Sequence, residues 1–249
     1  MKILISTPAF GGLVHTGYLN SLIGVMTSRE VLTKHQVSIA TISNDALVQR
    51  ARNELTKMAL DLKVDKMLFV DADITFTPQD FMRVADSPHE IIGGTYRKKS
   101  LEPILNFNLR TDIEKKMREK YGIPSSTPAG WKILKQEFAD EDGCVEALHL
   151  PTGFLCIHMD VIRKIIAEKG CAMYASDRRD AVRMQYSEEE MEKMLVPEIY
   201  TVGVCSGSKV LGSEDWLACE LFARHGYKIY LDTNIVCPHT GSLTLAFPL

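Results

Sequence analysis

A short apolar segment, residues 66–70, runs directly into two carboxylates, Asp71 and Asp73, that are separated only by Ala72. A run of this kind predicts a buried central strand, and open α/β sheets bind ligands beyond the carboxyl ends of their strands. Alternate residues of an extended chain project to the same side, so both carboxylates can face one hard cation such as Mg²⁺ or Mn²⁺. The alternative is that they cap the turn before a helix that begins at Pro78.

The bulk composition is that of an ordinary globular chain without a strong charge bias. Its 249 residues suffice for one domain with a full core, and 45% of them are hydrophobic. A formal net charge of −3 gives no overall attraction to nucleic acid or anionic membrane, so such contacts would depend on local basic runs. Most basic runs are merely solvated surface. The three candidates are Arg97-Lys98-Lys99, Lys115-Lys116-Arg118-Lys120 and Arg178-Arg179-Arg183.

The cysteine pattern and the amino terminus favour an intracellular protein. The six cysteines form no C-x-x-C pair and no zinc-like spacing, which fits a reducing compartment. Residues 1–8 lack the long apolar core of a signal peptide, and no apolar stretch is long enough to cross a bilayer. The sequence therefore predicts a cytoplasmic protein without a transmembrane segment.

The first part of the chain alternates between strand and helix patterns. Strand patterns at 2–7 and 36–41 enclose a helix pattern at 19–32, and this β-α-β order predicts a sheet that is at least partly parallel. A second helix, over about 46–62, leads into the 66–70 strand. The residues expected on its exposed face are Arg50, Arg52 and Asn53.

The rest of the chain combines sheet elements with two insertions. After a helix at 79–85, Gly93-Gly94 is expected to let the backbone approach a ligand closely at a turn. Residues 110–142 and 176–212 are charged and irregular, which indicates surface elaborations or a lid. The other expected elements are strands at 91–92, 145–150, 154–158, 228–231 and 235–237, helices at 160–168, 187–195 and 213–224, and a tight turn at 151–153.

Several motifs, in this order, carry a resemblance to a known family. They are Asp71-Ala72-Asp73, Gly93-Gly94-Thr95-Tyr96, Pro151-Thr152-Gly153, Ser213-Glu214-Asp215 and His239. The series resembles nucleotide-sugar glycosyltransferases of the GT-A fold, and especially the small family-2-like enzymes of phages and bacteria. A D-x-D motif alone is weak evidence, whereas the ordered combination spans nearly the whole chain and is much more specific.

The resemblance implies an α/β fold of the GT-A type, which is a Rossmann-like, mixed and mostly parallel central sheet flanked by helices. It implies a single catalytic domain over residues 1–249. Residues 1–109 would bind the nucleotide-sugar, and residues 143–249 would bind the acceptor. If the chain is viral, its compartment would be the host cytoplasm.

The resemblance also implies a metal site. Asp73 would bind the metal directly, and Asp71 would contact either the metal or the ribose. His239 would complete the coordination, and an imidazole beside two carboxylates favours Mn²⁺ over Mg²⁺. A hydrogen-bonded, purely structural histidine is the alternative for His239.

The donor site follows from the same resemblance, with a UDP-sugar as the first expectation. Cations after a flexible glycine pair suit phosphate, so Arg97 or Lys98 would meet the diphosphate. Arg52 would line the nucleotide, and a surface position on an amphipathic helix is its alternative. The residues implied for the donor site are Thr7, Pro8, Asp45, Arg52, Asp71, Ala72, Asp73, Arg97 and Gly153.

Glu214 and Asp215 are the implied catalytic residues. They stand at the start of a helix, so the alternative is that they complement the helix dipole. If the reaction inverts the anomeric carbon, Asp215 would act as general base and Glu214 would orient the acceptor, whereas a retaining reaction needs no such base. Inversion is slightly favoured. The neighbouring Trp216 would either stack on a sugar or pack in the core.

The acceptor and the class of protein have alternatives. The net charge favours a glycan, lipid-linked or small-molecule acceptor, whereas a phage-type relative would glycosylate a hydroxymethylated base in DNA. A non-catalytic nucleotide- or metal-binding module would keep the fold without turnover, and the intact acidic residues count against it. A metal-dependent nucleotidyltransferase ranks low, because Gly11-Gly12 is followed by no lysine until Lys34 and so forms no basic phosphate loop.

Overall fold

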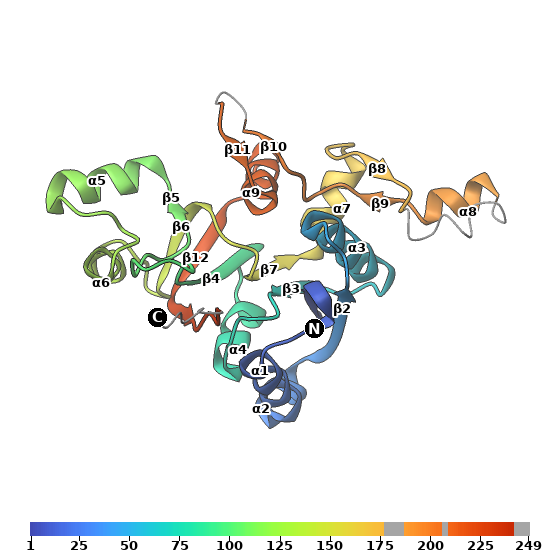
Figure 1. Cartoon of the computed structure of the whole chain (residues 1–249), viewed down its shortest axis with the longest axis horizontal. Coiled ribbons are helices and arrows are strands. Elements are labelled where there is room, and N and C mark those ends of the chain that lie inside the picture. Colours follow the sequence, from blue (N-terminus) through green and yellow to red (C-terminus); the bar gives the residue numbers. More distant parts are fainter. Residues whose placement is uncertain (177–186, 206–208, 242–249) are drawn as a thin grey trace, which may run out of the picture.

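The computed structural model describes residues 1–176, 187–205 and 209–241, and eight strands within these ranges form one sheet (Figure 1). They are β1 (Lys2–Ala9), β2 (Gln36–Ser43), β3 (Lys66–Val70), β4 (Ile91–Tyr96), β5 (Asn108–Leu109), β6 (Cys144–His149), β7 (Phe154–His158) and β12 (Ile229–Cys237). Their order across the sheet is β2-β1-β3-β7-β4-β12-β6-β5. Only β6 and β7 run against the other six, because β7 is antiparallel to β3 and β4, and β6 is antiparallel to β12 and β5. The predicted mixed, mostly parallel α/β sheet is confirmed.

Helices cover both faces of the sheet. One face carries α3 (Val48–Asp61), α7 (Met159–Ala167) and α9 (Glu214–Arg224), and the other carries α1 (Thr16–Thr27), α2 (Arg29–Lys34) and α4 (Pro78–Asp86). Successive strand residues point to opposite faces, so Met67 and Phe69 of β3 join one buried cluster while Leu68 and Val70 join the other. A strand that is buried on both faces is largely apolar, as residues 67–70 are, and the buried Lys66 at its start donates to the Ala85 and Ser87 carbonyls over 2.9 and 2.8 Å.

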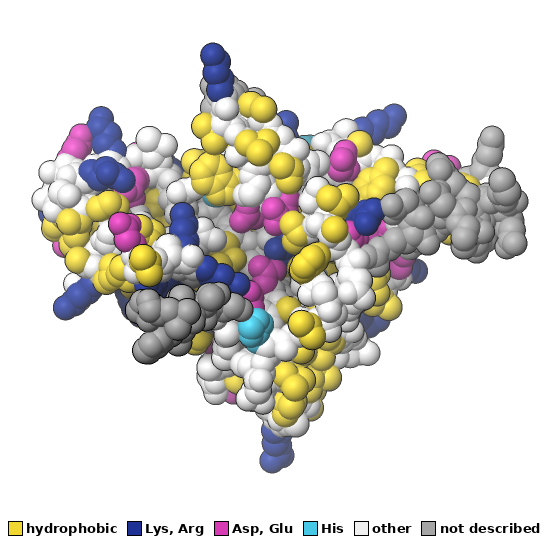
Figure 2. All heavy atoms as spheres, viewed as in Figure 1, with side chains coloured by type: hydrophobic (Ala, Val, Ile, Leu, Met, Phe, Trp, Pro, Cys, Tyr) yellow, Lys and Arg dark blue, Asp and Glu magenta, His cyan; other side chains and the backbone are white. Residues whose placement is uncertain are grey.

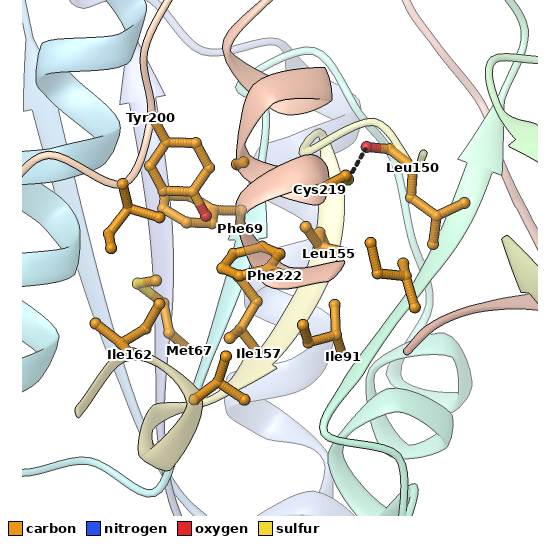
Figure 3. Close-up of a cluster of buried hydrophobic side chains, with 14 of the residues drawn as sticks. Met67, Phe69, Ile91, Leu150, Leu155, Ile157, Ile162, Tyr200, Cys219 and Phe222 are labelled. Carbon is orange, nitrogen blue, oxygen red and sulfur yellow. Dashed lines mark hydrogen bonds between the residues drawn. The ribbon is translucent and has the colours of Figure 1, made fainter. Parts of the chain in front are cut away.

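The larger core lies between the sheet and α3, α7 and α9. Figure 3 shows part of it, in which Phe69 packs edge-on against Tyr200 with 5.3 Å between ring centroids. The Cys219 thiol on α9 donates to the Leu150 carbonyl over 3.7 Å (Figure 3). The Cys219 contact holds α9 against the segment that follows β6.

The remaining elements lie outside the main sheet. Helices α5 (Thr111–Tyr121) and α6 (Pro128–Glu137) lie beyond its β5–β6 edge (Figure 1). The sequence pattern missed α6, which begins at Pro128 with Thr127 as its cap. The others are α8 (Glu188–Lys193) and two small antiparallel pairs, β8 (Met173–Tyr174) with β9 (Val196–Pro197) and β10 (Gly203–Val204) with β11 (Leu211–Gly212). None of the described helices combines the length and apolar character that crossing a membrane requires.

Two predicted elements differ from the structure. The single helix expected at 19–32 is two helices, because Ser28 is extended and its hydroxyl caps α2 by accepting from the Val31 N–H over 3.4 Å. The two strands expected at 228–231 and 235–237 form one strand, β12, with an irregular pairing between Leu231 and Val236. The polar stretch between them stays in β12 because Arg83 holds the buried Asp232 carboxylate at 2.6 and 3.0 Å.

The glycine pair also differs from the expectation. Gly93 and Gly94 lie inside β4 and are buried, so they form no turn that opens toward a ligand. A Cβ atom on Gly93 would lie 2.6 Å from the Phe154 carbonyl oxygen, and one on Gly94 would lie 2.3 Å from Ile235 Cγ2. These residues are glycine because neighbouring strands leave no room for a side chain.

Gly93→Ala is therefore expected to destabilise the fold. The new methyl group meets a backbone oxygen that cannot rotate away, so we expect a loss of about 1–3 kcal/mol in the free energy of unfolding. The measurement is the urea midpoint followed by circular dichroism. The matched control is Gly24→Ala in α1, where the methyl would lie 3.5 Å from Pro78. That change should be neutral or stabilising by up to about 1 kcal/mol, and equal midpoints for both variants would contradict the interpretation.

Candidate active site

The acid pair forms the turn that follows β3. The Asp71 N–H donates to the Gly153 carbonyl over 3.1 Å, and the Ile74 N–H donates back to the Asp71 carbonyl over 3.0 Å. The cap of α4 is made instead by Thr77 and Asp80, which bond each other's backbone N–H groups. Helix α4 is thus capped without the acid pair, and the Asp71 and Asp73 side chains contact other groups.

His239 and Lys99 both reach the Asp73 carboxylate. Lys99 Nζ lies 2.5 Å and His239 Nε2 lies 3.6 Å from the same atom, Asp73 Oδ2. The segment after β12 is held against the turn, because the Thr240 N–H donates to the Asp73 carbonyl over 3.0 Å. Burial alone would raise the pKa of Asp73, but the neighbouring His239 and Lys99 outweigh it and lower that pKa to about 2. Asp73 is thus a carboxylate at neutral pH.

His239 is oriented by the backbone. Its Nδ1 lies 2.8 Å from the Arg97 carbonyl oxygen, and because a carbonyl only accepts, Nδ1 carries the proton of this hydrogen bond. Nε2 then faces Asp73. Burial alone would lower the pKa of His239, but Asp73 and the Arg97 carbonyl together raise it. This arrangement resembles the way in which a second hydrogen bond orients metal-binding histidines.

Arg52 joins the acid pair to the start of α9. Its Nη2 donates to Asp71 Oδ1 over 2.9 Å, and its Nε donates to Glu214 Oε1 over 3.3 Å. The guanidinium lies over the Phe69 ring, 5.4 Å from the centroid, and only 4% of the side chain is exposed. The expectation that Arg52 lies on an exposed helix face is therefore wrong. The same expectation is wrong for Asn53, which is buried. Its side-chain amide donates to the Tyr200 carbonyl and accepts from the Tyr200 N–H.

A cavity of about 440 Å³ opens beside this network. Its wall includes six residues of the implied donor site. These are Pro8, Asp45, Arg52, Asp71, Ala72 and Asp73. Arg52 lines this cavity, and within the described residues its Nη1 is buried without a hydrogen-bond partner. Figure 2 shows acidic side chains gathered in a hollow at the centre of this face.

Three residues implied for the donor site do not line that cavity. Thr7 is fully buried, and its hydroxyl lies 2.6 Å from the Tyr18 hydroxyl, so it helps to pack α1 on β1. Gly153 lies against Tyr96, whose hydroxyl would be 2.4 Å from a Cβ atom there. The Arg97 guanidinium donates to two carbonyls of its own loop, at 3.1 and 2.9 Å, and does not face the acid pair.

Two apolar side chains that the sequence analysis missed also line the cavity. Phe10 and Leu13 follow β1 and are 77% and 76% exposed. Such exposure of an aromatic ring at a cavity mouth is a signal for a bound flat ligand, and it could be found only once the end of β1 was known to lie there.

If this cavity is the nucleotide site that the sequence predicts, Phe10→Ala is expected to weaken nucleotide binding about tenfold, because stacking of one base on an aromatic ring contributes roughly 1–3 kcal/mol. The measurement is calorimetric titration with a nucleoside diphosphate and Mn²⁺. Leu101→Ala is the control, since Leu101 is 95% exposed and does not line the cavity. A similar loss in both variants would mean that Phe10 acts only through general surface effects.

Glu214 and Asp215 occupy the first turn of α9. Glu214 is held by Arg52, as described above, while Asp215 Oδ1 accepts from the Ser213 hydroxyl and from the Trp216 N–H, the latter over 2.9 Å. Ser213 is the cap position of α9, but its hydroxyl makes no cap bond with the backbone. Trp216 stacks on the buried His149 with 4.6 Å between ring centroids, so one face of its indole is covered.

The first basic run reaches this site through Lys99, whereas the second run is paired elsewhere. Three of the four cations in the second run are paired on α5 and α6, as Lys115 with Glu119, Arg118 with Glu114 and Lys120 with Glu137. Their interpretation as solvated surface fits these pairs. Residues 178, 179 and 183 of the third run lie outside the described residues.

One further group of metal-ligating side chains lies away from the acid pair. Ligand atoms of His89, Asp140 and Cys144 are within 4.8 Å of one another. Asp140 Oδ1 already accepts from the backbone N–H groups of Asp142 and Cys144, at 3.1 and 2.7 Å, which assigns it to shaping the turn before β6.

Comparison with known proteins supports the fold. No family model and no curated protein matches the chain. Among solved structures, GalNAc-T7 with UDP, GalNAc and Mn²⁺ aligns with a TM-score of 0.50 and 8% sequence identity, over 96% of this chain and 44% of that one. Protein A197 from STIV aligns with a TM-score of 0.42 and 16% identity, over 66% of this chain and 69% of that one. The fold is GT-A-like, and the chain spans less than half of the GalNAc-T7 chain.

Proposed function

We propose that this chain is a divalent-metal-dependent glycosyltransferase that moves a sugar from a nucleoside diphosphate to an acceptor hydroxyl. The observation that carries the proposal is the meeting of Asp73 and His239 beside a cavity whose wall contains Arg52, while Arg52 also contacts the first turn of α9. The proposed cation site, the cavity and the proposed catalytic residues Glu214 and Asp215 would then lie along one edge of the sheet. The GT-A-like fold supports the same class.

The residues fit a divalent ion such as Mn²⁺. Asp73 is ionised, and the hydrogen bond from Nδ1 of His239 leaves its Nε2 facing the carboxylate, so an oxygen and a nitrogen ligand converge. A mixed set of carboxylate and imidazole suits Mn²⁺ better than Mg²⁺. When bound, the metal would neutralise the negative charge that develops on the departing diphosphate.

The cavity is proposed as the donor site. Its volume of about 440 Å³ falls in the range of small-molecule sites, roughly 300–1,000 Å³. Phe10 offers a face to the base, and Arg52 in the cavity wall places a positive charge beside the proposed position of the diphosphate. GalNAc-T7 was solved with UDP, GalNAc and Mn²⁺, which makes UDP-sugars the first donors to test.

Asp215 is proposed as the general base of an inverting transfer. The acceptor oxygen attacks the anomeric carbon and forms the new C–O bond, and the bond from that carbon to the diphosphate breaks. Asp215 takes the proton of the acceptor hydroxyl. The hydrogen bonds from Ser213 and Trp216 fix one carboxylate oxygen, while Glu214 remains tied to Arg52 and can orient the acceptor only from that position.

The donor-binding half is proposed to be residues 1–109, because every residue that lines the cavity lies between Pro8 and Asp73. The acceptor half is proposed to be residues 143–249, which supply Glu214 and Asp215. A glycan, lipid-linked or small-molecule acceptor is favoured over a DNA base, since the formal net charge of −3 gives no overall attraction to nucleic acid. The segment proposed as a lid, 176–212, lies partly outside the described residues.

Thermal stabilisation tests the proposal. The purified chain is heated with UDP, GDP, CDP or dTDP and their sugars, each with and without Mn²⁺. A ligand at 100 times its Kd stabilises the fold by about 2.7 kcal/mol, so the matching nucleotide with Mn²⁺ should raise Tm by about 5–10 °C. No shift with any of them would overturn the proposal. A shift without either sugar transfer or donor hydrolysis would identify a non-catalytic nucleotide-binding module.

A further inference from the structure

The loop between β4 and β5 holds one lysine over the acid pair. Arg97 fixes the loop from inside, because its guanidinium bonds the Ser100 and Leu101 carbonyls and its backbone bridges to Leu105. The Lys98 N–H closes the same loop on the Ile104 carbonyl over 2.9 Å. The residue presented to the site is therefore Lys99, rather than the expected Arg97 or Lys98.

Lys99 occupies the position of a counter-ion to the candidate metal ligand. Its ammonium lies 2.5 Å from Asp73 Oδ2, which is also the oxygen that faces His239 Nε2. A divalent cation bound by Asp73 and His239 would meet this ammonium at close range, and two cations so near each other repel. The side chain is 48% exposed and can move away, since no packed core restrains it.

We propose that Lys99 is an exchangeable counter-ion, which a divalent metal displaces from Asp73 and which then binds the diphosphate of the nucleotide. This inference rests on the proposed function. Metal alone must break the contact between Lys99 and Asp73 without offering the lysine a new partner. Metal together with a nucleoside diphosphate offers it phosphate oxygens, so each ligand improves the binding of the other.

The predicted effects of removing the ammonium have opposite signs. In Lys99→Met, Mn²⁺ alone no longer competes with a cation at Asp73, so its affinity should rise about two- to fivefold, the range expected for losing one half-exposed ion pair. Affinity for UDP in the presence of Mn²⁺ should fall, because one phosphate contact is lost. A residue that only supported the loop would weaken both or neither.

The experiment measures free Mn²⁺ by electron paramagnetic resonance during titration of wild type, Lys99→Met and Lys98→Met, each with and without UDP. Lys98 is the matched control, because it is the adjacent lysine of the same loop and its side chain makes no ion pair among the described residues. We expect Lys98→Met to bind Mn²⁺ as wild type does. Methionine keeps most of the lysine's length and apolar stem, so the loop should be preserved.

The outcomes separate this inference from the proposed function. If wild type binds no Mn²⁺ either with or without UDP, the metal-dependent function fails. If wild type binds Mn²⁺ more tightly with UDP but Lys99→Met binds Mn²⁺ alone as wild type does, the exchange of Lys99 is overturned while the function stands. Weaker binding of Mn²⁺ alone by Lys99→Met would likewise overturn it, since the lysine would then support the site rather than compete for it.

Discussion

Asp215→Asn is expected to lower the turnover of sugar transfer by about 10²–10⁴-fold, the usual contribution of a positioned general base. The amide has the shape of the carboxylate, and its oxygen can still accept the Trp216 N–H that Asp215 Oδ1 accepts at 2.9 Å. It cannot take a proton from the acceptor. Donor affinity should stay within about twofold of wild type, because Asp215 does not line the donor cavity.

The measurement combines single-turnover kinetics with donor titration of the same preparation. Glu220→Gln serves as the control, since Glu220 is another acid of α9 that does not contact Arg52, and it should transfer sugar at close to the wild-type rate. Near-wild-type turnover of Asp215→Asn would reject the base, and retention of anomeric configuration in the product would explain why none is needed. A large loss of donor affinity would instead assign Asp215 to binding.

The parts of the site that are local in sequence could be predicted. Residues 67–70 are apolar because both faces of β3 are covered, and this apolar run ends where the acidic residues begin. Asp71 and Asp73 follow directly, so their place at the carboxyl end of β3 required no long-range information. Ordered motifs then predicted that His239, far along the chain, returns to the same place, and its Nε2 lies 3.6 Å from Asp73.

The parts of the site that depend on contacts between distant residues could not be predicted from the sequence. The helix that carries Arg52 has an amphipathic pattern, which predicts an exposed polar face. That face is covered by residues near Tyr200 and by the start of α9, where Glu214 stands 162 positions away from Arg52. Once the side chain is enclosed, its charge has to be met by carboxylates, and Asp71 and Glu214 supply them.

The sequence likewise does not show which of three neighbouring cations contacts Asp73. Arg97, Lys98 and Lys99 are equivalent in sequence as a basic run. The loop geometry distinguishes them, because Arg97 satisfies its own loop carbonyls and Lys99 is the one brought to Asp73. The glycine pair that precedes this run was interpreted as a flexible turn, whereas packing against Phe154 and Ile235 explains it. A glycine can indicate either a flexible backbone or a position with no room for a side chain. Only the packing of the neighbouring strands distinguishes the two.

Asp73→Asn is expected to abolish metal-dependent nucleotide binding. The amide keeps the size of the side chain but loses the charge, and an amide oxygen is a much poorer ligand for a divalent cation than a carboxylate. Losing even an outer partner of a metal site typically weakens the metal about 10–100-fold, so we expect at least a 100-fold loss of Mn²⁺ affinity in the presence of UDP. The measurement is the same Mn²⁺ titration, with Tm recorded to show that the variant is folded.

Asp142→Asn is the matched control, because Asp142 is an exposed acid in the turn before β6 and is absent from the cavity wall. It should bind Mn²⁺ and UDP as wild type does. The two variants at this ion pair should change Mn²⁺ affinity in opposite directions. Removing the Asp73 carboxylate should weaken Mn²⁺ binding, whereas removing the Lys99 ammonium that faces it should strengthen it. If Asp73→Asn kept wild-type binding of Mn²⁺ and UDP, the metal would have to be held elsewhere, and the pairing of Asp73 with Lys99 would be an ordinary surface ion pair.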